Sequence, residues 1–464
     1  MSAPPDRSRP PEPAGAATPF ALPPFVRGEL ANGLGLYVAR LPRAPLVSMI
    51  AMLPAGGHFD PIGRPGVASF HGYLLDNGGK RRSAVEIATQ VESLGGLMGS
   101  SAGWGMAFVE VGMLARHLDA ALDLMSEAVR EPGFPDAEVE RLRRRRSAEV
   151  LRRRDQPRKL TAQLHDAVLY QGTVYGQLLP GTAESVAALT RGEILDFHQR
   201  HSVPQGSAIL VVGDVDEEDV VRRLETTFGD WTGGPAVPAP TIEPPPRRGV
   251  DVYLVDRPKA PQTELAVGHV GIARTDPDFG AIRLLSTLLG GMFNSRLNLN
   301  LRERHGFTYS VQSSFAMRHG PGPFRVRAAV TNESAGKAVE EILHEIRRLR
   351  DEPIPIDELR HAQGYLVDIF PYTLQTIDDL SKRLETLATF GLPDDYYDSY
   401  PANLWDYGPE ELLEVARRRL HPDDAVVVAT GDAESLRPQL EHLGRVHVVT
   451  PEEVLRGERG TIAS

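Results

Sequence analysis

Apolar residues recur at helical spacing in one segment of each half of the chain. They are Leu118, Leu122 and Met125 in the first segment and Val339, Ile342 and Ile346 in the second. Spacings of three and four residues place side chains on one face of a helix, so both segments are predicted to be amphipathic helices. Pro132 and Pro353 end these helices, because proline lacks an N–H and its ring clashes with the preceding turn. A second helix follows each break and begins near Asp136 or Asp357, whose charge favours a helix N-terminus.

Another landmark repeats in the same order later in each half. An apolar run leads into Gly213-Asp214 in the first half and into Gly431-Asp432 in the second. Each is typical of a buried strand, a tight turn and a following helix. Landmarks that recur in one order indicate an internal duplication. Because strands and helices do not alternate strictly, we predict an α+β fold made of two homologous sheet-plus-helices domains.

Proline density marks the predicted boundary between these domains. Residues 233–249 read GGPAVPAPTIEPPPRRG, which is typical of a semi-rigid extended linker. The start of the chain is rich in proline and alanine and lacks the apolar core of a signal peptide, so it is predicted to be a flexible leader. The predicted organisation is a leader at 1–24, an N-terminal domain at 25–232, the linker, and a C-terminal domain at 250–464.

The composition narrows the classes of partner and chemistry. Acidic residues outnumber basic ones by 62 to 51, a net charge of −11, so the average surface repels nucleic acid and anionic membranes. The absence of cysteine excludes disulfides, thiolate metal sites and cysteine nucleophiles. No apolar run approaches the roughly 18–20 residues of a membrane-spanning helix. We therefore expect a cytoplasmic protein that binds proteins or peptides, with no nucleic acid and no membrane as partner.

Four stretches of the chain, in matching order and separation, resemble the pitrilysin/insulinase family of zinc metallopeptidases. They are GRPGVASFHGYLL from Gly63, KRRSAVEIATQVESLGG from Lys80, YGQLLPGTAESVAALTRGEILDFHQRH from Tyr175, and LLGGMFNSRLNLNLRERHGFTYSV from Leu288. The resemblance covers nearly all of residues 26 to 450. It implies that the two domains form half of a clamshell that encloses unfolded peptides.

The resemblance also identifies what the first domain lacks. Active members carry H-x-x-E-H on a helix, where two histidines bind zinc and the glutamate activates the zinc-bound water. The matching positions are Ser69, Gly72 and Tyr73, and Glu140 falls where the family supplies its third metal ligand. One carboxylate cannot hold zinc with useful affinity, so we expect no metal and no catalytic residue in this chain. His71 has no glutamate or second histidine at the required spacing and is interpreted as a partly exposed helix residue.

The second domain keeps another feature of the family, an arginine and a tyrosine seven residues apart, Arg302 and Tyr309. We expect Arg302 in the last turn of a helix that carries Leu297 and Leu301, with Gly306 as its left-handed cap and Tyr309 on the next strand. An arginine fork and a tyrosine hydroxyl can together hold a peptide carbonyl or a carboxylate. In the family this pair contacts substrate, although such residues are commonly structural when spacing is the only argument.

A basic run from Arg141 to Lys159 is a competing signal, because clustered arginines can bind phosphates or acidic peptides. The run also contains Glu149 and Asp155 and lacks interleaved aromatic residues. We interpret it as a solvated or chamber-facing charged helix.

A chain that lacks the zinc motif and keeps the arginine–tyrosine pair resembles the non-catalytic subunit of the bacterial heterodimeric members. The resemblance implies a substrate-binding subunit, inactive alone, that processes short or unfolded peptides with a catalytic paralogue that carries H-x-x-E-H and the zinc. Two alternatives stay open. One is a structural or assembly protein of the same fold with no role in proteolysis, and the other is a homodimer that captures peptides without cleaving them.

Overall fold

The computed structural model describes residues 22–458 and 461–462. The predicted leader, residues 1–24, therefore lies outside the described residues except for its last three. Of these, Leu22 is buried, and its backbone N–H donates to the Asp398 carboxylate at 2.9 Å. The first described residues therefore pack against the C-terminal half.

Strands of the first half form a mixed sheet, which contains six strands in the order β1-β2-β6-β3-β5-β4 within the described residues. They are β1 (Val26–Glu29), β2 (Gly35–Arg40), β3 (Leu46–Leu53), β4 (Leu97–Ala102), β5 (Ala107–Leu114) and β6 (Ala208–Gly213). β2 and β6 are parallel, whereas β3 is antiparallel to both β5 and β6.

Strands of the second half form another mixed sheet, with the order β13-β12-β7-β11-β8-β10-β9 among the described strands. They are β7 (Asp251–Asp256), β8 (Thr263–Val270), β9 (Val311–Phe315), β10 (Pro323–Val330), β11 (Val426–Gly431), β12 (Arg445–Val449) and β13 (Thr461–Ile462). The order β7-β11-β8-β10-β9 repeats β2-β6-β3-β5-β4, and the parallel pair β7–β11 corresponds to β2–β6. The predicted α+β fold with two similar sheet-plus-helix units is confirmed.

Helices of the first half follow the predicted breaks. They are α1 (Val67–Leu74), α2 (Ala84–Ser93), α3 (Leu118–Arg130), α4 (Asp136–Arg153), α5 (Pro157–Leu169), α6 (Ala183–Ala188), α7 (Arg191–His201) and α8 (Glu217–Phe228). Short 3₁₀ turns lie at Gly57–Phe59, Ala115–His117 and Val174–Gly176.

Helices of the second half show the same succession. They are α9 (Phe279–Ser286), α10 (Ala335–Asp351), α11 (Ile356–Ile369), α12 (Ile377–Phe390), α13 (Tyr396–Asp406), α14 (Pro409–Arg419), α15 (Ala433–Leu440) and α16 (Pro451–Arg456). Thr287–Gly291 and Asn298–Arg304 are π-helical, and 3₁₀ turns lie at Asn332–Ser334, Phe370–Leu374 and Pro422–Asp424. No helix in the described part of the chain is long and apolar enough to cross a membrane.

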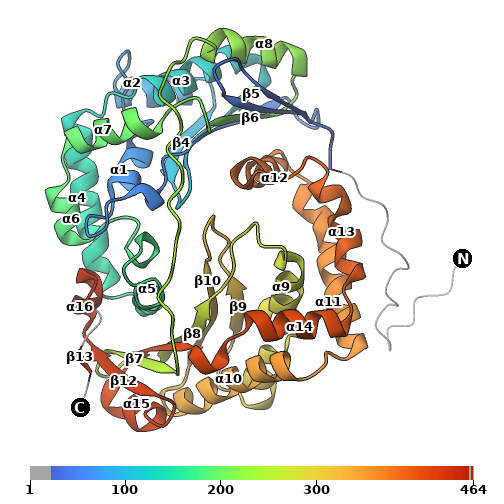
Figure 1. Ribbon diagram of the computed structural model, residues 1–464. Helices are drawn as coiled ribbons and strands as arrows, with labels where there is room; N and C mark the ends of the chain where they lie inside the picture. The colour runs from blue at the N-terminus through green and yellow to red at the C-terminus, as the bar shows by residue number, and fades with distance from the viewer. Residues whose placement is uncertain (1–21, 459–460, 463–464) are drawn as a thin grey trace, which may run out of the picture.

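Each half contributes one helix to the sheet of the other half. α5 packs on β8 and β11 of the second sheet, and α12 packs on β3 and β6 of the first sheet, beside which it lies in Figure 1. Leu380, Leu384 and Leu387 of α12 are fully buried in this contact. The exchange explains why β6 and β11 are buried along their whole length, since helices cover both of their faces.

The segment Gly233–Gly249 contains no helix or strand and runs along the molecule between the two halves (Figure 1). Several contacts hold it: Ile242 is buried near Gly320 and Tyr175, and hydrogen bonds run from the Ala236 N–H to Gln205 at 3.3 Å and from the Gly249 N–H to Asp424 at 2.8 Å. The domain boundaries at 25–232 and 250–464 stay a prediction, and α5 belongs to the first of these ranges by sequence while it packs on the second sheet.

Candidate functional site

Helix α1 carries the positions that match the zinc motif, and its place in the fold is fixed from both ends. The Asp60 carboxylate accepts hydrogen bonds from the N–H groups of Gly66 and Ala68, at 2.6 and 2.8 Å, and so stabilises the start of the helix. At Gly72 the helix touches β4 so closely that an added Cβ would lie 2.6 Å from the Ala102 Cβ and the Ser101 carbonyl oxygen. A glutamate at position 72 therefore requires β4 to move.

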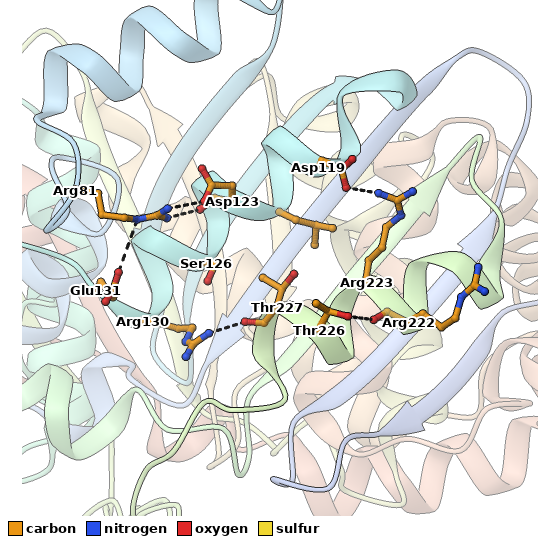
Figure 2. Close-up of a pocket in the computed structure, with 11 residues that line it drawn as sticks. Arg81, Asp119, Asp123, Ser126, Arg130, Glu131, Arg222, Arg223, Thr226 and Thr227 are labelled. Atoms are coloured by element: carbon orange, nitrogen blue, oxygen red, sulfur yellow. Dashed lines mark hydrogen bonds and ion pairs between the residues drawn. The ribbon is translucent and has the colours of Figure 1, made fainter.

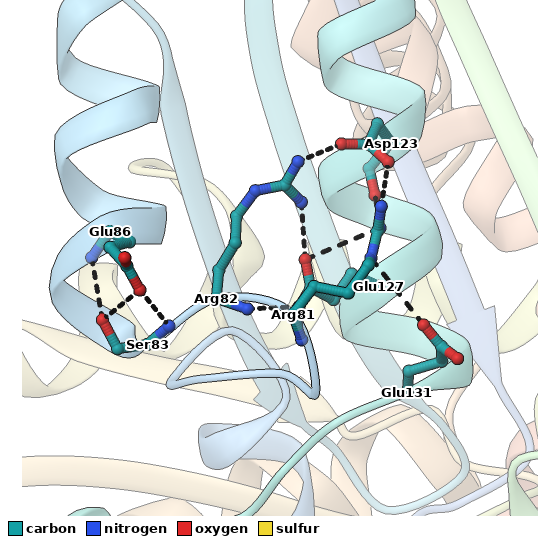
Figure 3. Close-up of polar contacts among 7 residues, drawn as sticks. All are labelled: Arg81, Arg82, Ser83, Glu86, Asp123, Glu127 and Glu131. Carbon is teal, nitrogen blue, oxygen red and sulfur yellow. Dashed lines mark hydrogen bonds and ion pairs between the residues drawn. The ribbon is translucent and has the colours of Figure 1, made fainter.

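The loop after α1 is held by a buried carboxylate of α3 (Figure 3). Glu127 has a side chain that is 1% exposed and accepts hydrogen bonds from the backbone N–H groups of Arg81 and Arg82, at 2.7 and 2.8 Å. The Arg82 guanidinium bonds the same carboxylate and also Asp123. Gly79 is required there, because a Cβ at that position would meet the Glu127 side chain at 2.4 Å. These contacts anchor the α1–α2 connection to α3.

A guanidinium from α4 stands between the two positions that histidines would occupy. Arg146 is 8% exposed in its side chain, its Nη2 donates to Ser69 Oγ at 3.3 Å, and its Cζ lies 4.1 Å from the centre of the Tyr73 ring. Glu149, one turn further along α4, accepts from Arg146 Nη1 at 2.7 Å. A hydroxyl, a phenol ring and a fixed positive charge are a poor donor set for zinc, which takes imidazole, thiolate or carboxylate ligands. The residues present do not fit the family's metal.

Glu140 is not part of this cluster. Its side chain is 53% exposed and pairs with Arg143 at 3.0 Å. It lies six residues before Arg146 in α4, or about 9 Å along a helix axis. The carboxylate of α4 that hydrogen bonds Arg146 is that of Glu149, and the assignment of Glu140 to the degenerate site stays a prediction from the resemblance. Among the described residues, no group of three or more histidine, cysteine, aspartate or glutamate side chains is arranged to hold a metal ion.

The basic run is a charged helix whose arginines pair with nearby acids. Arg141 pairs with Glu138, Arg143 with Glu140, and Arg145 with Glu149. Among the charged residues of the run, Arg146 is buried and the others are exposed or half-buried. The interpretation of the run as a solvated or chamber-facing charged helix did not foresee that Arg146 is buried and pairs with Glu149, three residues further along the helix.

His71 is fully buried, so the interpretation of this residue as partly exposed is wrong. α7 packs across α1 and brings His198 Nδ1 to 3.0 Å from His71 Nε2, with Ser202 Oγ at 3.1 Å from the same nitrogen. Burial lowers the pKa of His71 well below its usual value and lowers that of His198 to about 4. Both imidazoles are therefore neutral at pH 7 and act as core residues joined by hydrogen bonds.

In the second half, the segment with the arginine–tyrosine pair has the predicted local geometry. Leu297 and Leu301 are fully buried, Arg302 lies in the last turn of the π-helical segment Asn298–Arg304, and Gly306 has a φ of +65°. The N–H of Phe307 donates to the Leu301 carbonyl at 2.9 Å and closes the helix end.

A buried ion pair ties this segment to α11. The Arg296 guanidinium donates two hydrogen bonds to the Glu358 carboxylate, at 2.7 and 2.9 Å, and the Arg296 side chain is only 8% exposed. Planar two-point pairing fixes orientation as well as distance. The segment that presents Arg302 is therefore rigidly placed.

The structure brings Arg302 and Tyr309 together. The Arg302 Cζ lies 5.3 Å from the centre of the Tyr309 ring and 4.6 Å from that of Phe293, so two aromatic rings contact the guanidinium. Tyr309 is 86% exposed and Phe293 is 66% exposed. Tyr309 lies in the loop two residues before β9 and not on the strand, which corrects its expected placement. Phe293 was missed, because nothing in the sequence indicates that it meets Arg302.

This exposed group can bind hydrogen-bond acceptors. Aromatic rings in contact with a guanidinium leave its edges, where the N–H donors lie, free for a carbonyl or carboxylate. One edge of Arg302 meets Glu303, with Nε 3.4 Å from Oε1. The exposed Tyr309 hydroxyl offers a further donor.

A groove of about 490 Å³ lies between α3 and α8 (Figure 2), and none of Ser69, Gly72, Tyr73, Arg302 and Tyr309 lines it. Its arginines are already engaged: Arg81 pairs with Asp123, Arg223 with Asp119, and Arg130 donates to the Thr227 carbonyl. The remaining arginine, Arg222, pairs with Asp219 beside the groove, so every arginine of the groove already has a partner within the protein.

Comparisons with known proteins agree with the fold and identify the family. Residues 38–182 match the family described as insulinase (peptidase family M16), and residues 188–366 match the peptidase M16 inactive domain. The chain is 23% identical over 393 residues to an uncharacterized zinc protease of Rickettsia bellii, covering 84% of this chain and 91% of that protein. It is 25% identical over 399 residues to an uncharacterized zinc protease of Streptomyces coelicolor, covering 84% and 86%.

A crystal structure of a peptidase M16 inactive domain from Pseudomonas fluorescens has a similar fold. Its TM-score is 0.82 at 24% identity, covering 88% of this chain and 98% of that one. Fold and site together define a two-unit protein of the zinc-metallopeptidase type in which other side chains stand at the metal positions. The two family matches span more than half of the sequence, and the chain belongs to peptidase family M16, the pitrilysin/insulinase family. It is a member without the zinc-binding motif.

Proposed function

We propose that the chain is the non-catalytic, substrate-binding subunit of a heterodimeric zinc metalloendopeptidase that degrades or processes short or unfolded peptides. The observation that carries the proposal is the contrast between the two halves. Arg302 and Tyr309 are adjacent and accessible in the second half, whereas Arg146 fills the vacated position in the first. A catalytic paralogue that carries H-x-x-E-H would supply the zinc and the activated water.

The residues of this chain would act by binding and orienting peptide. The free edge of Arg302 and the hydroxyl of Tyr309 donate to a carbonyl oxygen of an extended peptide and hold it beside the partner's site. Phe293 and Tyr309 restrict the Arg302 guanidinium, which reduces the conformational entropy lost when a peptide binds.

Reconstitution with a paralogue tests the proposal. The purified chain should not cleave peptides in a zinc-dependent manner, and activity that a chelator abolishes should emerge when it is mixed with an H-x-x-E-H paralogue. In the reconstituted pair, Arg302→Ala and Tyr309→Ala should each lower kcat/KM at least tenfold, as expected from the loss of a charged or geometrically placed hydrogen bond of about 1.4 kcal/mol or more.

Matched controls separate this effect from a general loss of surface contacts. Arg222 and Tyr372 are also exposed, at 74% of the Arg222 side chain and 69% of Tyr372, and their alanine variants should keep activity. Chelator-sensitive hydrolysis by the isolated chain would contradict the proposal.

A structural or assembly role is the second candidate, and the exposed apolar patch of Phe293, Leu299 and Tyr309 favours it. These side chains are 66%, 50% and 86% exposed, which is also expected of a subunit contact. The same variants discriminate between the two roles. Lost turnover in an intact complex supports substrate binding, whereas unchanged turnover supports scaffolding.

A further inference from the structure

A second pocket lies in the C-terminal half, beside the C-terminal end of α12. It is formed by the loop before α9, the α12–α13 turn and one face of α13, which lie near one another in Figure 1. Its volume is about 460 Å³, within the range of pockets that hold small molecules or one or two amino-acid residues. Arg302, Tyr309 and Phe293 do not line it.

The pocket is mainly aromatic and contains one buried cation. The aromatic lining residues are Phe279, Phe390, Tyr396, Tyr400 and Tyr407. Arg274 is only 6% exposed, and its Cζ lies 3.7 Å from the centre of the Phe279 ring and 5.0 Å from that of Tyr396. A guanidinium taken this far out of water normally pairs with a carboxylate.

No carboxylate pairs with Arg274 within the described part of the chain. The acids next to it in sequence are engaged elsewhere: Asp276 accepts from Arg419 at 2.9 Å, and Asp278 accepts from Arg418 and Arg419 at 3.0 and 2.7 Å. Tyr396, whose ring centre lies 5.0 Å from the Arg274 Cζ, supplies no negative charge, because burial raises the pKa of its hydroxyl. These three arginines and two aspartates leave one positive charge. Arg274 and Asp276 both line the pocket, but Asp276 is paired with Arg419, so the uncompensated charge there is that of the buried Arg274.

We propose that this pocket binds a carboxylate attached to an apolar group, as in the C-terminal residue of a peptide or a small aromatic acid. The carboxylate would pair with the free edge of Arg274, and the apolar group would pack among the tyrosine and phenylalanine rings. A ligand of this kind supplies the carboxylate partner that Arg274 lacks among the described residues, and it buries apolar surface against the aromatic rings of the pocket. The proposal is independent of the Arg302–Tyr309 pair.

Calorimetric titration of the full chain with three probes tests this pocket. N-acetylphenylalanine and 3-phenylpropanoate carry the carboxylate, and N-acetylphenylalanine amide lacks it. Both acids should bind at least tenfold more tightly than the amide. Tighter binding of N-acetylphenylalanine indicates a peptide C-terminus as the ligand, and tighter binding of 3-phenylpropanoate indicates a free acid.

Two variants locate the binding. Arg274→Gln keeps a polar side chain without the charge. This variant should bind both acids at least tenfold more weakly than the wild type and should bind the amide with unchanged affinity. Asn403→Trp changes an exposed residue of the pocket lining and should block all three probes with Arg274 intact. Arg222→Gln, on the distant helix α8, should have no effect. Equal affinity for acid and amide, wild-type binding by the folded Asn403→Trp variant, or no binding of any probe would overturn the proposal.

Discussion

Arg146 is predicted to be a main stabilising contact between α4 and α1, although arginine is rarely buried. Arg146→Met is the sharpest test, because methionine keeps much of the aliphatic stem and removes the guanidinium. The variant loses the contact with the Tyr73 ring at 4.1 Å, the hydrogen bond to Glu149 at 2.7 Å and the longer one to Ser69 at 3.3 Å.

The expected cost follows from these contacts. A partly desolvated cation–π contact contributes about 1–2 kcal/mol, and a hydrogen bond between charged groups contributes about 1.5–3 kcal/mol. Glu149 keeps a second partner, Arg145, at 2.9 Å, so it is not left as an unpaired charge. We therefore expect Arg146→Met to lower the free energy of unfolding by about 2–4 kcal/mol.

Urea unfolding followed by circular dichroism measures this loss. Arg144→Met, an exposed arginine on the same helix, is the matched control and should change stability by less than about 0.5 kcal/mol. A double-mutant cycle with Tyr73→Leu should give a coupling energy near 1 kcal/mol. If Arg146→Met is as stable as the Arg144 control, or if no coupling to Tyr73 is found, the guanidinium does not fill this position and the reasoning fails.

Three further predictions concern the same half of the molecule. The triple variant S69H/G72E/Y73H should not bind zinc while Arg146 is present, and it should lose about 2 kcal/mol or more because a side chain at position 72 meets β4; metal analysis after dialysis and urea unfolding check both outcomes. Burial lowers the pKa of His198 to about 4, so the unfolded chain takes up a proton below its usual pKa of 6.5 while the folded chain stays neutral. This contribution should leave stability unchanged above pH 6.5 and remove about 3 kcal/mol between pH 6.5 and 4, and His198→Gln should reduce that slope in urea unfolding. Glu127→Ala should cost about 3 kcal/mol, measured in the same way, because it leaves buried donors of the Arg81–Arg82 loop unpaired.

The duplication and the α+β class were predictable from sequence because the signals that carry them are local. Pro132 and Pro353 break helices wherever they stand, and a strand that ends in Gly-Asp before a helix is readable from neighbouring residues alone. The exchange of α5 and α12 was not predictable, since an amphipathic helix packs equally well on either of two similar sheets. Which sheet it covers is decided by side chains far apart in sequence, such as Thr161 and Thr430, whose hydroxyl oxygens lie 2.6 Å apart.

The candidate site was likewise predictable only where neighbouring residues carry the signal. Spacing of Leu297, Leu301 and Gly306 was enough to place Arg302 in the last helical turn. Tyr309 was placed on the strand because the start of β9 depends on pairing with β10, where Val311 lies opposite Ala328, and such pairing leaves no local mark. Burial of His71 and Arg146 depends on how α7 and α4 cross α1, which periodicity within one helix does not reveal.

The two halves of this chain show how one duplicated fold can separate structure from function. In the first half, a cation from the protein itself stands where the family's active members hold a metal cation, and it joins α4 to α1 through protein groups alone. A metal ion beside Arg146 would be repelled by the positive charge of the guanidinium. In the second half, Arg296 is buried and paired with Glu358, whereas Arg302 is half-buried, contacts two exposed aromatic rings and meets Glu303 along only one edge. An arginine paired within the fold contributes structure, whereas an arginine with unpaired donors is available to a ligand, and this contrast supports the proposal that the second half binds peptide.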